Sequence, residues 1–475
     1  SVEEDAILVI TFVGFKAKEI KAAKDIGTIK MELEAQLLSE VGVTVNTGYQ
    51  RIKPEQSTGS IAAITKKDYD SRVNTDFLSG MANKLPGLMI NNDVQFSSDL
   101  NNISSSKNLF NIRGISTISG NQDPLIVIDG YPTELKLNMI NPNEIESVTI
   151  LKDAAASTVY GVRASNGVIV IERKQAKIGK IRVDFRANTS ITPKTDFTRF
   201  RWDKDMAAIN VAYEREKHKT SLSPTSWDNI IKPRQQFLYS PVYYVMAQEE
   251  ASIISPEEAA LKYQELGSYN NAEEYSRLLL QNKLTQSYNV NLSGGSPVAT
   301  YYISANYTGN RAEKINNNNR LFLLSARTNL SLSKRFKVEL TTDYQEDRSN
   351  SAPVIDIGLL YPYEPLQDAN GIPLPINKNN NIHFYNNPAF MNLGFLDGLE
   401  YPLVDVNEIS NKVQTSSNRF TANFKYDITK AINFNFGGIY EYARIEDAYL
   451  ASEKSSVARQ YVNYYSLLNS SGKLV

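Results

Sequence analysis

Strict alternation of apolar and polar residues dominates the second half of the chain. In the segment IRVDFRANTS (residues 181–190), the first four odd positions are apolar and the even positions are charged or polar. A period of two predicts a β-strand with one apolar and one polar face. Six more segments have this pattern: QSYNVNLS (286–293), TYYISANYTG (300–309), LLSARTNLSL (323–332), FKVELTTDY (336–344), RFTANFKYDI (419–428) and INFNFGGIYEY (432–442).

The connections between these seven strands are predicted to alternate long, short, long, short, long, short. The first, about residues 192–285, contains SPEEAALKYQEL, where Ser255 at the N-cap and Pro256 at the next position predict a helix. The third long connection, about residues 347–418, is rich in Pro and Asn. Long loops at one end and tight turns at the other are typical of membrane β-barrels, and a soluble sheet or sandwich is the alternative.

The preceding region, from about residue 59 to 173, has a mixed α/β pattern. SIAAIT, NLFNIRGIS, DPLIVIDGYP and VIVIER predict strands, and NTDFLSGMANKLPG predicts a helix that ends at Pro86-Gly87. The segment VTILKDAAASTVYGVRASNGVIVI (148–171) predicts strand, short helix, turn and strand. Its expected helix cap is Asp153, its helix end is Gly161 and its turn is Asn166-Gly167, with a further turn at Asp129-Gly130.

Composition narrows the function classes. Lys and Arg total 51 against 52 for Asp and Glu, which argues against a general nucleic-acid binder. Cys is absent and there are only two His, so we expect no thiolate metal site, no histidine zinc site and no cofactor. We find no phosphate loop and no Gly-x-Ser-x-Gly elbow, and we therefore expect no enzyme activity.

Membrane insertion is not excluded by the hydropathy pattern. No apolar run reaches the length of about 18 residues that a transmembrane helix needs, but transmembrane strands need only about ten alternating residues. The 27 Tyr and 18 Phe suit the aromatic girdles of a membrane barrel, and they suit an ordinary β-rich core equally well.

Three segments give the chain a family resemblance. FNIRG (110–114), PLIVIDGYP (124–132) and NEIESVTILKDAAASTVYGVRASNGVIVIERK (143–174) resemble, in order and spacing, the plug of SusC-like TonB-dependent outer-membrane transporters. DAILVITFVGFKAKEI (5–20) resembles the last strands of the carboxypeptidase-regulatory-like domain that these proteins carry. The resemblance implies four parts: the end of that β-domain (1–37), the TonB-box region and linker (38–58), the plug (59–180) and the first barrel strands with extracellular loops (181–475).

The resemblance also implies a mechanism. TonB would capture the extended segment that contains Val41, Val43, Val45, Gly48 and Tyr49, by adding a strand to a sheet edge. A SusD-like lid lipoprotein would sit on the long loops, and transporter and lid would pair into a dimer of pairs in the outer membrane of a Gram-negative bacterium of the Bacteroidota type. The plug residues expected to shape or dock the plug are Arg113, Gly114, Asp129, Gly130, Lys152, Asp153, Tyr160, Gly161, Arg163, Asn166 and Gly167.

Two departures from the family pattern keep a second function open. The box region has Thr44 and Asn46 among its valines and Gln50 after Gly48-Tyr49. Seven strands are also fewer than the about 22 with which such barrels close, so we expect a chain truncated at both ends. The main expectation is uptake of an oligosaccharide or peptide, and the alternative is a scaffold in an outer-membrane assembly or secretion complex. The substrate-binding residues are unknown.

Overall fold

The computed structural model contains two main sheets, one small and one large. It describes residues 7–10, 18–21, 29–30, 45–46, 51–52, 61–69, 77, 81, 84–86, 88–90, 110–112, 124–133, 140–152, 160–164, 166–197, 206–223, 225–230, 239–376 and 393–467. All seven alternating segments are occupied by strands, and each predicted strand of the α/β region contains a described strand, although NLFNIRGIS is described only at residues 110–112. No helix in these ranges is both long enough and apolar enough to cross a membrane.

The smaller sheet forms the centre of what we call the α/β unit. Its strand order is β5 (Ile61–Thr65), β10 (Ile145–Leu151), β11 (Val168–Arg173), β8 (Leu125–Ile128) and β9 (Tyr131–Thr133). Only β11 and β8 run parallel. The central strands contribute side chains to two buried apolar clusters, one with Ile150 and Ile169 and one with Leu151 and Val168, so the sheet is covered on both sides. Ile150, Ile169 and Ile171 are completely buried in its core.

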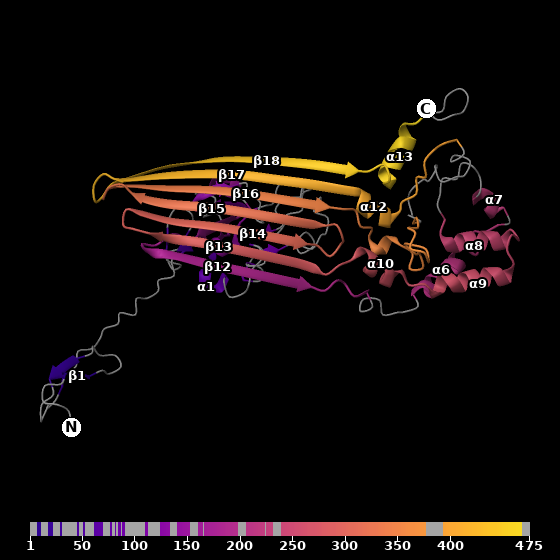
Figure 1. Cartoon of the computed structure of the whole chain (residues 1–475), viewed down its shortest axis with the longest axis horizontal. Coiled ribbons are helices and arrows are strands. Elements are labelled where there is room, and N and C mark those ends of the chain that lie inside the picture. The colour runs from indigo at the N-terminus through magenta and orange to yellow at the C-terminus, as the bar shows by residue number, and fades with distance from the viewer. Residues whose placement is uncertain are drawn as a thin grey trace.

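Short elements surround this sheet. Helix α1 (Lys66–Tyr69) follows β5, the 3-10 helix η4 (Pro142–Glu144) precedes β10, and η5 (Gly161–Ala164) precedes β11. Three separate two-stranded pairs are β1 (Ile7–Ile10) with β2 (Lys18–Lys21), β3 (Val45–Asn46) with β4 (Arg51–Ile52), and β6 (Met89–Ile90) with β7 (Phe110–Asn111). Figure 1 shows β1 well apart from the small sheet. The alternating segment TIKMELEAQ (28–36) predicts a strand, but only its residues 29–30 are described, and they are not in a strand.

Two glycines are required by the backbone of the α/β unit. Asp129 and Gly130 have φ values of 49° and 88°, which closes the tight hairpin between β8 and β9. Gly167 has a φ of 92°, and a β-carbon there would lie 2.9 Å from Cδ1 of Ile112. A larger residue at either glycine would therefore be strained.

The larger sheet is an antiparallel meander of seven strands. In spatial order these are β12 (Gly179–Thr192), β13 (Lys283–Gly295), β14 (Ala299–Arg311), β15 (Asn318–Ser331), β16 (Phe336–Ser351), β17 (Ile409–Asp427) and β18 (Asn433–Ala451). One predicted connection is wrong. The link between β14 and β15 is short, because both strands extend beyond their alternating cores and leave only residues 312–317 between them.

The two faces of this sheet differ in chemistry. On one face the buried side chains of β13 and β14 are polar, as at Asn289, Ser304 and Asn306. On the other face Phe185, Phe322 and Phe436 are exposed. Figure 1 shows the α/β unit against the sheet, and the hydrogen bonds described below join it to the polar face. The sheet thus covers the α/β unit with polar residues and presents apolar ones outward.

Helices gather at one end of the large sheet (Figure 1). They are α6 (Met206–His218), α7 (Ser226–Ile230), α8 (Pro241–Glu250), α9 (Pro256–Ser268), α10 (Asn271–Leu279), η6 (Ile357–Leu359), α12 (Pro402–Glu408) and α13 (Ser456–Tyr465). The predicted N-cap of α9 is confirmed, since Ser255 and Glu258 form a reciprocal capping box. The two long connections pack together through buried groups, for example the Tyr363 hydroxyl, which donates to Glu214 at 2.6 Å.

Candidate functional site

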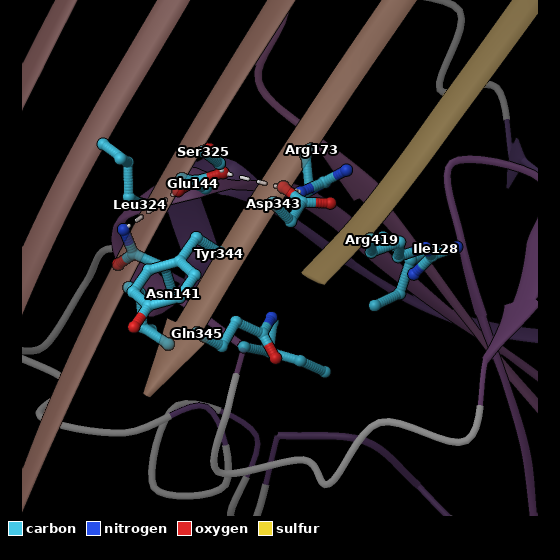
Figure 2. A pocket seen from close by; sticks show the side chains of 12 residues that line it. Ile128, Asn141, Glu144, Arg173, Leu324, Ser325, Asp343, Tyr344, Gln345 and Arg419 are labelled. Carbon is cyan, nitrogen blue, oxygen red and sulfur yellow. Dashed lines mark hydrogen bonds and ion pairs between the residues drawn. The ribbon is translucent and has the colours of Figure 1, made fainter. Parts of the chain in front are cut away.

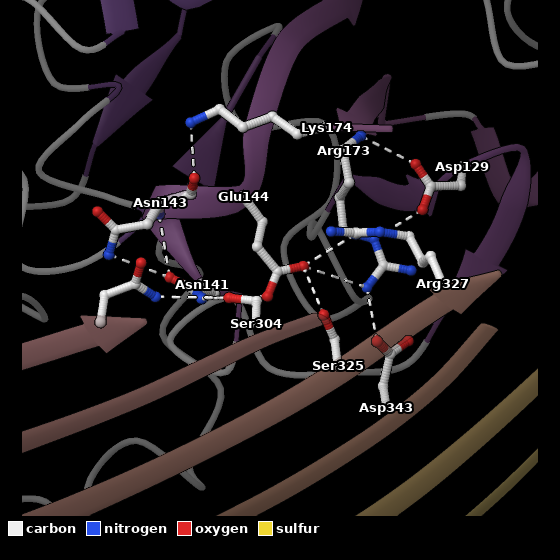
Figure 3. Close-up of polar contacts among 11 residues, drawn as sticks. Asp129, Asn141, Asn143, Glu144, Arg173, Lys174, Ser304, Ser325, Arg327 and Asp343 are labelled. Atoms are coloured by element: carbon white, nitrogen blue, oxygen red, sulfur yellow. Dashed lines mark hydrogen bonds and ion pairs between the residues drawn. The ribbon is translucent and has the colours of Figure 1, made fainter. Parts of the chain in front are cut away.

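The candidate site is a cluster of buried charges between the α/β unit and the polar face of the large sheet (Figure 3). Polar residues that face each other across two separately packed units must be paired in order to be buried. The cluster has three carboxylates and three guanidinium groups, and each unit contributes both signs. Its members are Asp129, Glu144 and Arg173 from the α/β unit, and Arg327, Asp343 and Arg419 from the sheet.

Arg173, the last residue of β11, bridges the two units. Its Nε lies 2.6 Å from Oδ2 of Asp129, and its backbone NH donates to Oδ1 of the same carboxylate at 2.9 Å. Its Nη1 donates to Oδ1 of Asp343 on β16 at 2.7 Å. Burial alone would lower the pKa of the Arg173 guanidinium. The surrounding carboxylates outweigh burial, with Asp343 contributing most, and raise this pKa well above its ordinary value.

Glu144 forms the second bridge, from the end of η4. Its Oε2 accepts a hydrogen bond from the Ser325 hydroxyl on β15 at 2.8 Å and lies 2.9 Å from Nη1 of Arg327 on the same strand. No side-chain nitrogen of Arg327 has hydrogen-bond geometry to a described residue, so this contact is an ion pair without a hydrogen bond. The Arg327 guanidinium also lies 4.7 Å from the ring centre of Tyr302.

The two carboxyl groups that the α/β unit contributes to the cluster, those of Asp129 and Glu144, are ionised in this setting. Burial raises the pKa of Asp129, but attraction to Arg173 and Arg327 outweighs it, so this pKa lies below its ordinary value. The pKa of Glu144 is lowered for the same reason, with Arg327 the strongest of the attracting groups. The docked arrangement therefore favours charged carboxylates at neutral pH.

Neutral hydrogen bonds surround the charges. The Asn141 side chain donates to the Ser304 hydroxyl on β14 at 3.0 Å. Arg186 on β12 donates to the Asn143 side chain at 3.4 Å, and Thr133 donates to Glu441 on β18 at 3.4 Å. The Tyr131 hydroxyl donates to Asn423 on β17. The contacts thus extend from β12 to β18 across the sheet.

Arg419 occupies a distinct position in the cluster. It lies directly across from Asp343 in the register of β16 and β17, and it is 3% exposed. Its Nε and Nη1 have no hydrogen-bond partner among the described residues. It lines a cavity of about 20 Å³ together with Arg173, Asp343 and Glu144. Figure 2 shows the side chains that line this cavity. That space is sufficient for about one water molecule.

The residues singled out from sequence are distributed unevenly over this site. Asp129 belongs to the cluster, Gly130 to its hairpin and Gly167 to the contact with Ile112. Tyr160, Gly161 and Asn166 precede β11, and Lys152 follows β10, all within the α/β unit. Val45 lies in β3 and Arg163 in η5, where only the backbone is described. Seven predicted residues lie outside the described ranges: Val41, Val43, Gly48, Tyr49, Arg113, Gly114 and Asp153.

Sequence reasoning missed Glu144, Arg173 and their partners on the sheet. A usable signal was present, because Arg327, Asp343 and Arg419 are charges on the polar face of strands whose other face is apolar. Which of them pair could not be read from the sequence, since Arg173 and Asp343 are 170 positions apart.

Comparison with known proteins identifies the α/β unit. Residues 53–168 match the family model described as TonB-dependent Receptor Plug Domain. The TonB-dependent receptor SusC of Bacteroides thetaiotaomicron is 33% identical over 189 residues, which cover 38% of this chain and 18% of that protein. The TonB-dependent receptor P3 of Formosa agariphila is 24% identical over 339 residues, covering 71% of this chain and 28% of that protein.

The fold has solved counterparts. A structure of the RagAB peptide importer in the open-open state matches with a TM-score of 0.55 at 16% identity, over 85% of this chain and 43% of that chain. A closed-closed RagAB structure gives a TM-score of 0.52 at 15% identity, over 82% and 42%. The chain thus spans less than half the length of these relatives.

Proposed function

Since the chain carries the plug domain and part of the barrel of a SusC-like TonB-dependent receptor, we propose that it takes part in TonB-driven uptake of a large nutrient, an oligosaccharide or a peptide. The match to the plug domain and to SusC supports a location in the outer membrane. The observation that carries the proposal is the buried charge cluster, which holds the plug on the barrel through pairs that water can replace when the two separate.

The energetics of the cluster suit a plug that must both seal and move. A buried ion pair that loses one partner costs about 3–5 kcal/mol, so the docked plug is held firmly. When the plug leaves the barrel, water enters the interface and hydrates both partners of each ion pair, so much of that cost disappears. Asp343 also keeps Arg419 directly opposite it after Arg173 leaves. The barrel is therefore not left with an isolated buried carboxylate.

The remaining parts of the proposal follow the family pattern. The segment around Val41, Val43, Val45, Gly48 and Tyr49 is the TonB contact, residues 38–58 form the box region and linker, and residues 59–180 form the plug. Val45 and Asn46 already pair with Ile52 and Arg51 as a short strand pair, which is the geometry that strand addition by a partner extends. A SusD-like lipoprotein covers the helix-bearing loops, which face outward from the cell, and two transporter–lid pairs form the dimer.

The substrate class is open to direct test. RagAB is a peptide importer, which makes peptides one class to test beside oligosaccharides. Aromatic side chains at the helix-bearing end offer flat apolar surfaces that suit either class, as in the exposed, stacked pair Tyr461 and Tyr465 of α13, with ring centres 5.9 Å apart. The experiment should therefore offer both classes.

A reversible lock between plug and barrel tests the proposal. Asn141 and Ser304 contact each other across the interface, and the sequence has no Cys, so the pair Asn141→Cys and Ser304→Cys introduces the only two thiols of this chain. The native host, carrying the full-length receptor with this pair, is grown on single oligosaccharides or peptides as the sole carbon source. We expect loss of growth on the receptor-dependent nutrient, and recovery when the disulfide is reduced.

The matched control places the disulfide within the barrel. Asn291 and Ser304 are register partners on β13 and β14, so Asn291→Cys with Ser304→Cys leaves the plug free. This control should grow normally. If the locked receptor supports growth as well as the control does, plug movement is not needed and the import proposal is wrong. The scaffold alternative makes a different prediction. Deletion of the receptor would then leave growth on every tested nutrient unchanged, and the proteins that bind its helix-bearing end would be secretion components.

A further inference from the structure

The outward face of the barrel carries a cluster of cations that the import mechanism does not use. Arg311 on β14, Arg320 on β15 and Arg348 on β16 all project from this face near the helix-bearing end, since they share the strand parity of the exposed Tyr307 and Phe322 and of the half-buried Tyr344. Lys412 and Arg444 continue the cluster on β17 and β18. We call these five side chains the basic band: Arg311, Arg320, Arg348, Lys412 and Arg444.

The basic band begins where the apolar surface ends. On three strands the outward face changes, within one or two alternate positions, from an aromatic residue to a charged one. Moving along each strand toward the helix-bearing end, the outward residues are Phe322 and then Arg320 on β15. On β16 they are Tyr344, Glu346 and Arg348, and on β14 they are Tyr307, Gly309 and Arg311. Such an aromatic row is typical of the boundary between hydrocarbon and lipid headgroups.

A second aromatic row sets the other boundary of the apolar surface. Phe336 stacks near Phe424, with ring centres 6.5 Å apart, and Phe424 has the same spacing from Phe436. Phe336 and Tyr344 are eight residues apart on β16, which corresponds to roughly 27 Å along a strand. With a strand tilt of about 40° this spacing corresponds to roughly 21 Å along the membrane normal, somewhat less than the about 25 Å apolar band of an outer-membrane barrel. The basic band therefore lies at headgroup level.

The charges of the band are incompletely neutralised by the protein. Arg348 forms an ion pair with Glu346 at 2.7 Å, and Arg444 pairs with Glu446. Arg311, Arg320 and Lys412 have no ion pair with any described residue. Arg320 and Arg348 are also direct cross-strand partners, an arrangement of like charges that is unfavourable unless an anion lies between them.

We propose that the basic band binds the phosphate groups of membrane lipids in the leaflet at the helix-bearing end of the barrel. Guanidinium groups bind phosphate through paired, charge-assisted hydrogen bonds, and Arg is better suited than Lys to this geometry. The acyl chains of the same lipid lie along the apolar surface below. This inference needs the barrel to be in a membrane, and it does not depend on what the receptor imports.

The test measures lipid binding to the purified full-length receptor in detergent by native mass spectrometry. The probes are diphosphoryl lipid A and the same lipid with both phosphates removed. We expect the phosphorylated probe to bind at least about tenfold more tightly than the dephosphorylated one. Replacement of three cations, Arg311→Gln, Arg320→Gln and Arg348→Gln, should remove this difference, and these exposed positions leave the fold intact.

Two further variants make the result specific. Lys217→Gln, Lys219→Gln and Lys454→Gln remove the same charge from exposed positions in the connections between strands and should leave binding unchanged. Glu346→Gln releases Arg348 from its ion pair and should tighten binding severalfold. Equal binding of the two probes, or equal loss in the connection variant and the band variant, would overturn the proposal.

Discussion

Apolar packing stabilises the interior of the plug, whereas ion pairs and hydrogen bonds bind the plug to the barrel. Within the plug, Ile150, Ile169 and Ile171 are completely buried among other apolar side chains. Between plug and barrel, the close contacts are ion pairs and hydrogen bonds of Arg173, Glu144 and Asn141. Apolar packing loses its stabilisation on exposure to water, whereas charges regain hydration.

This difference suits a domain that leaves its seat as a folded body. The internal core makes unfolding costly, and the polar interface makes separation reversible. The predictions below change one region at a time, and they read two quantities separately: the free energy of unfolding the plug, and the free energy of docking it on the barrel.

The largest effect should come from the plug core. Ile150→Ala removes a completely buried side chain, which should lower the free energy of plug unfolding by about 4 kcal/mol. Hydrogen exchange of the full-length receptor should show this as faster exchange in β10 and β11. A change confined to the contacts with the barrel would contradict the assignment of Ile150 to the core.

Glu144→Gln should act on docking instead. It leaves Arg327 buried without its ion-pair partner, at a cost of about 3 kcal/mol in docking free energy. Ser417 on β17 is buried and its hydroxyl makes no hydrogen bond with described residues, so a Cys placed there reports release of the plug. Labelling of that Cys should speed up by roughly 100-fold.

The control is two residues away. Glu146 belongs to the same segment but is exposed, so Glu146→Gln should leave the labelling rate unchanged. Equal rates in the Glu144 and Glu146 variants would mean that the buried charge cluster does not hold the plug.

Acid should release the plug more gradually. The pKa values of Asp129 and Glu144 are lowered in the docked state, so docking is stabilised above their ordinary values of 3.8 and 4.5. That stabilisation is lost as the pH falls through the lowered values. Labelling at Ser417→Cys should therefore stay constant from neutral pH to about pH 5 and rise below that. A rise near pH 6 would point to another titrating group.

The smallest effect concerns the aromatic support of Arg327. Tyr302→Leu removes the ring that lies beneath the guanidinium, and should weaken docking by about 1 kcal/mol without changing plug unfolding. The neighbouring Tyr301→Leu, on the opposite face of β14, serves as the control. An effect as large as that of Glu144→Gln would show that Tyr302 does more than support Arg327.

Much of the architecture was predictable because it depends on local pattern. The period of two predicted the seven strands, and Ser255 with Pro256 predicted the start of α9. The turn at Asp129-Gly130 followed from residues that tolerate positive φ. The short link between β14 and β15 was missed because strand ends beyond the alternating segment, such as Asn318 and Arg311, have no apolar signal.

The charge cluster was less predictable, because its pairs join distant parts of the chain. Asp129 was singled out for its turn, and its ion pair with Arg173 depends on the pairing of β8 with β11. Glu144 looked like an ordinary charge before a strand, and only the position of β15 reveals its buried partners. Local pattern predicts elements, whereas such contacts require the packed structure.

The central claim is that the interface yields before the plug core does. It is tested most directly by hydrogen exchange on the full-length receptor in a lipid bilayer, comparing the native protein with Glu144→Gln. The account predicts faster exchange in η4 and along the polar edges of β14 and β15, while the amides of β10 and β11 keep their native protection. If β10 and β11 lose protection together with the interface, the plug does not separate as a folded body, and the account is contradicted.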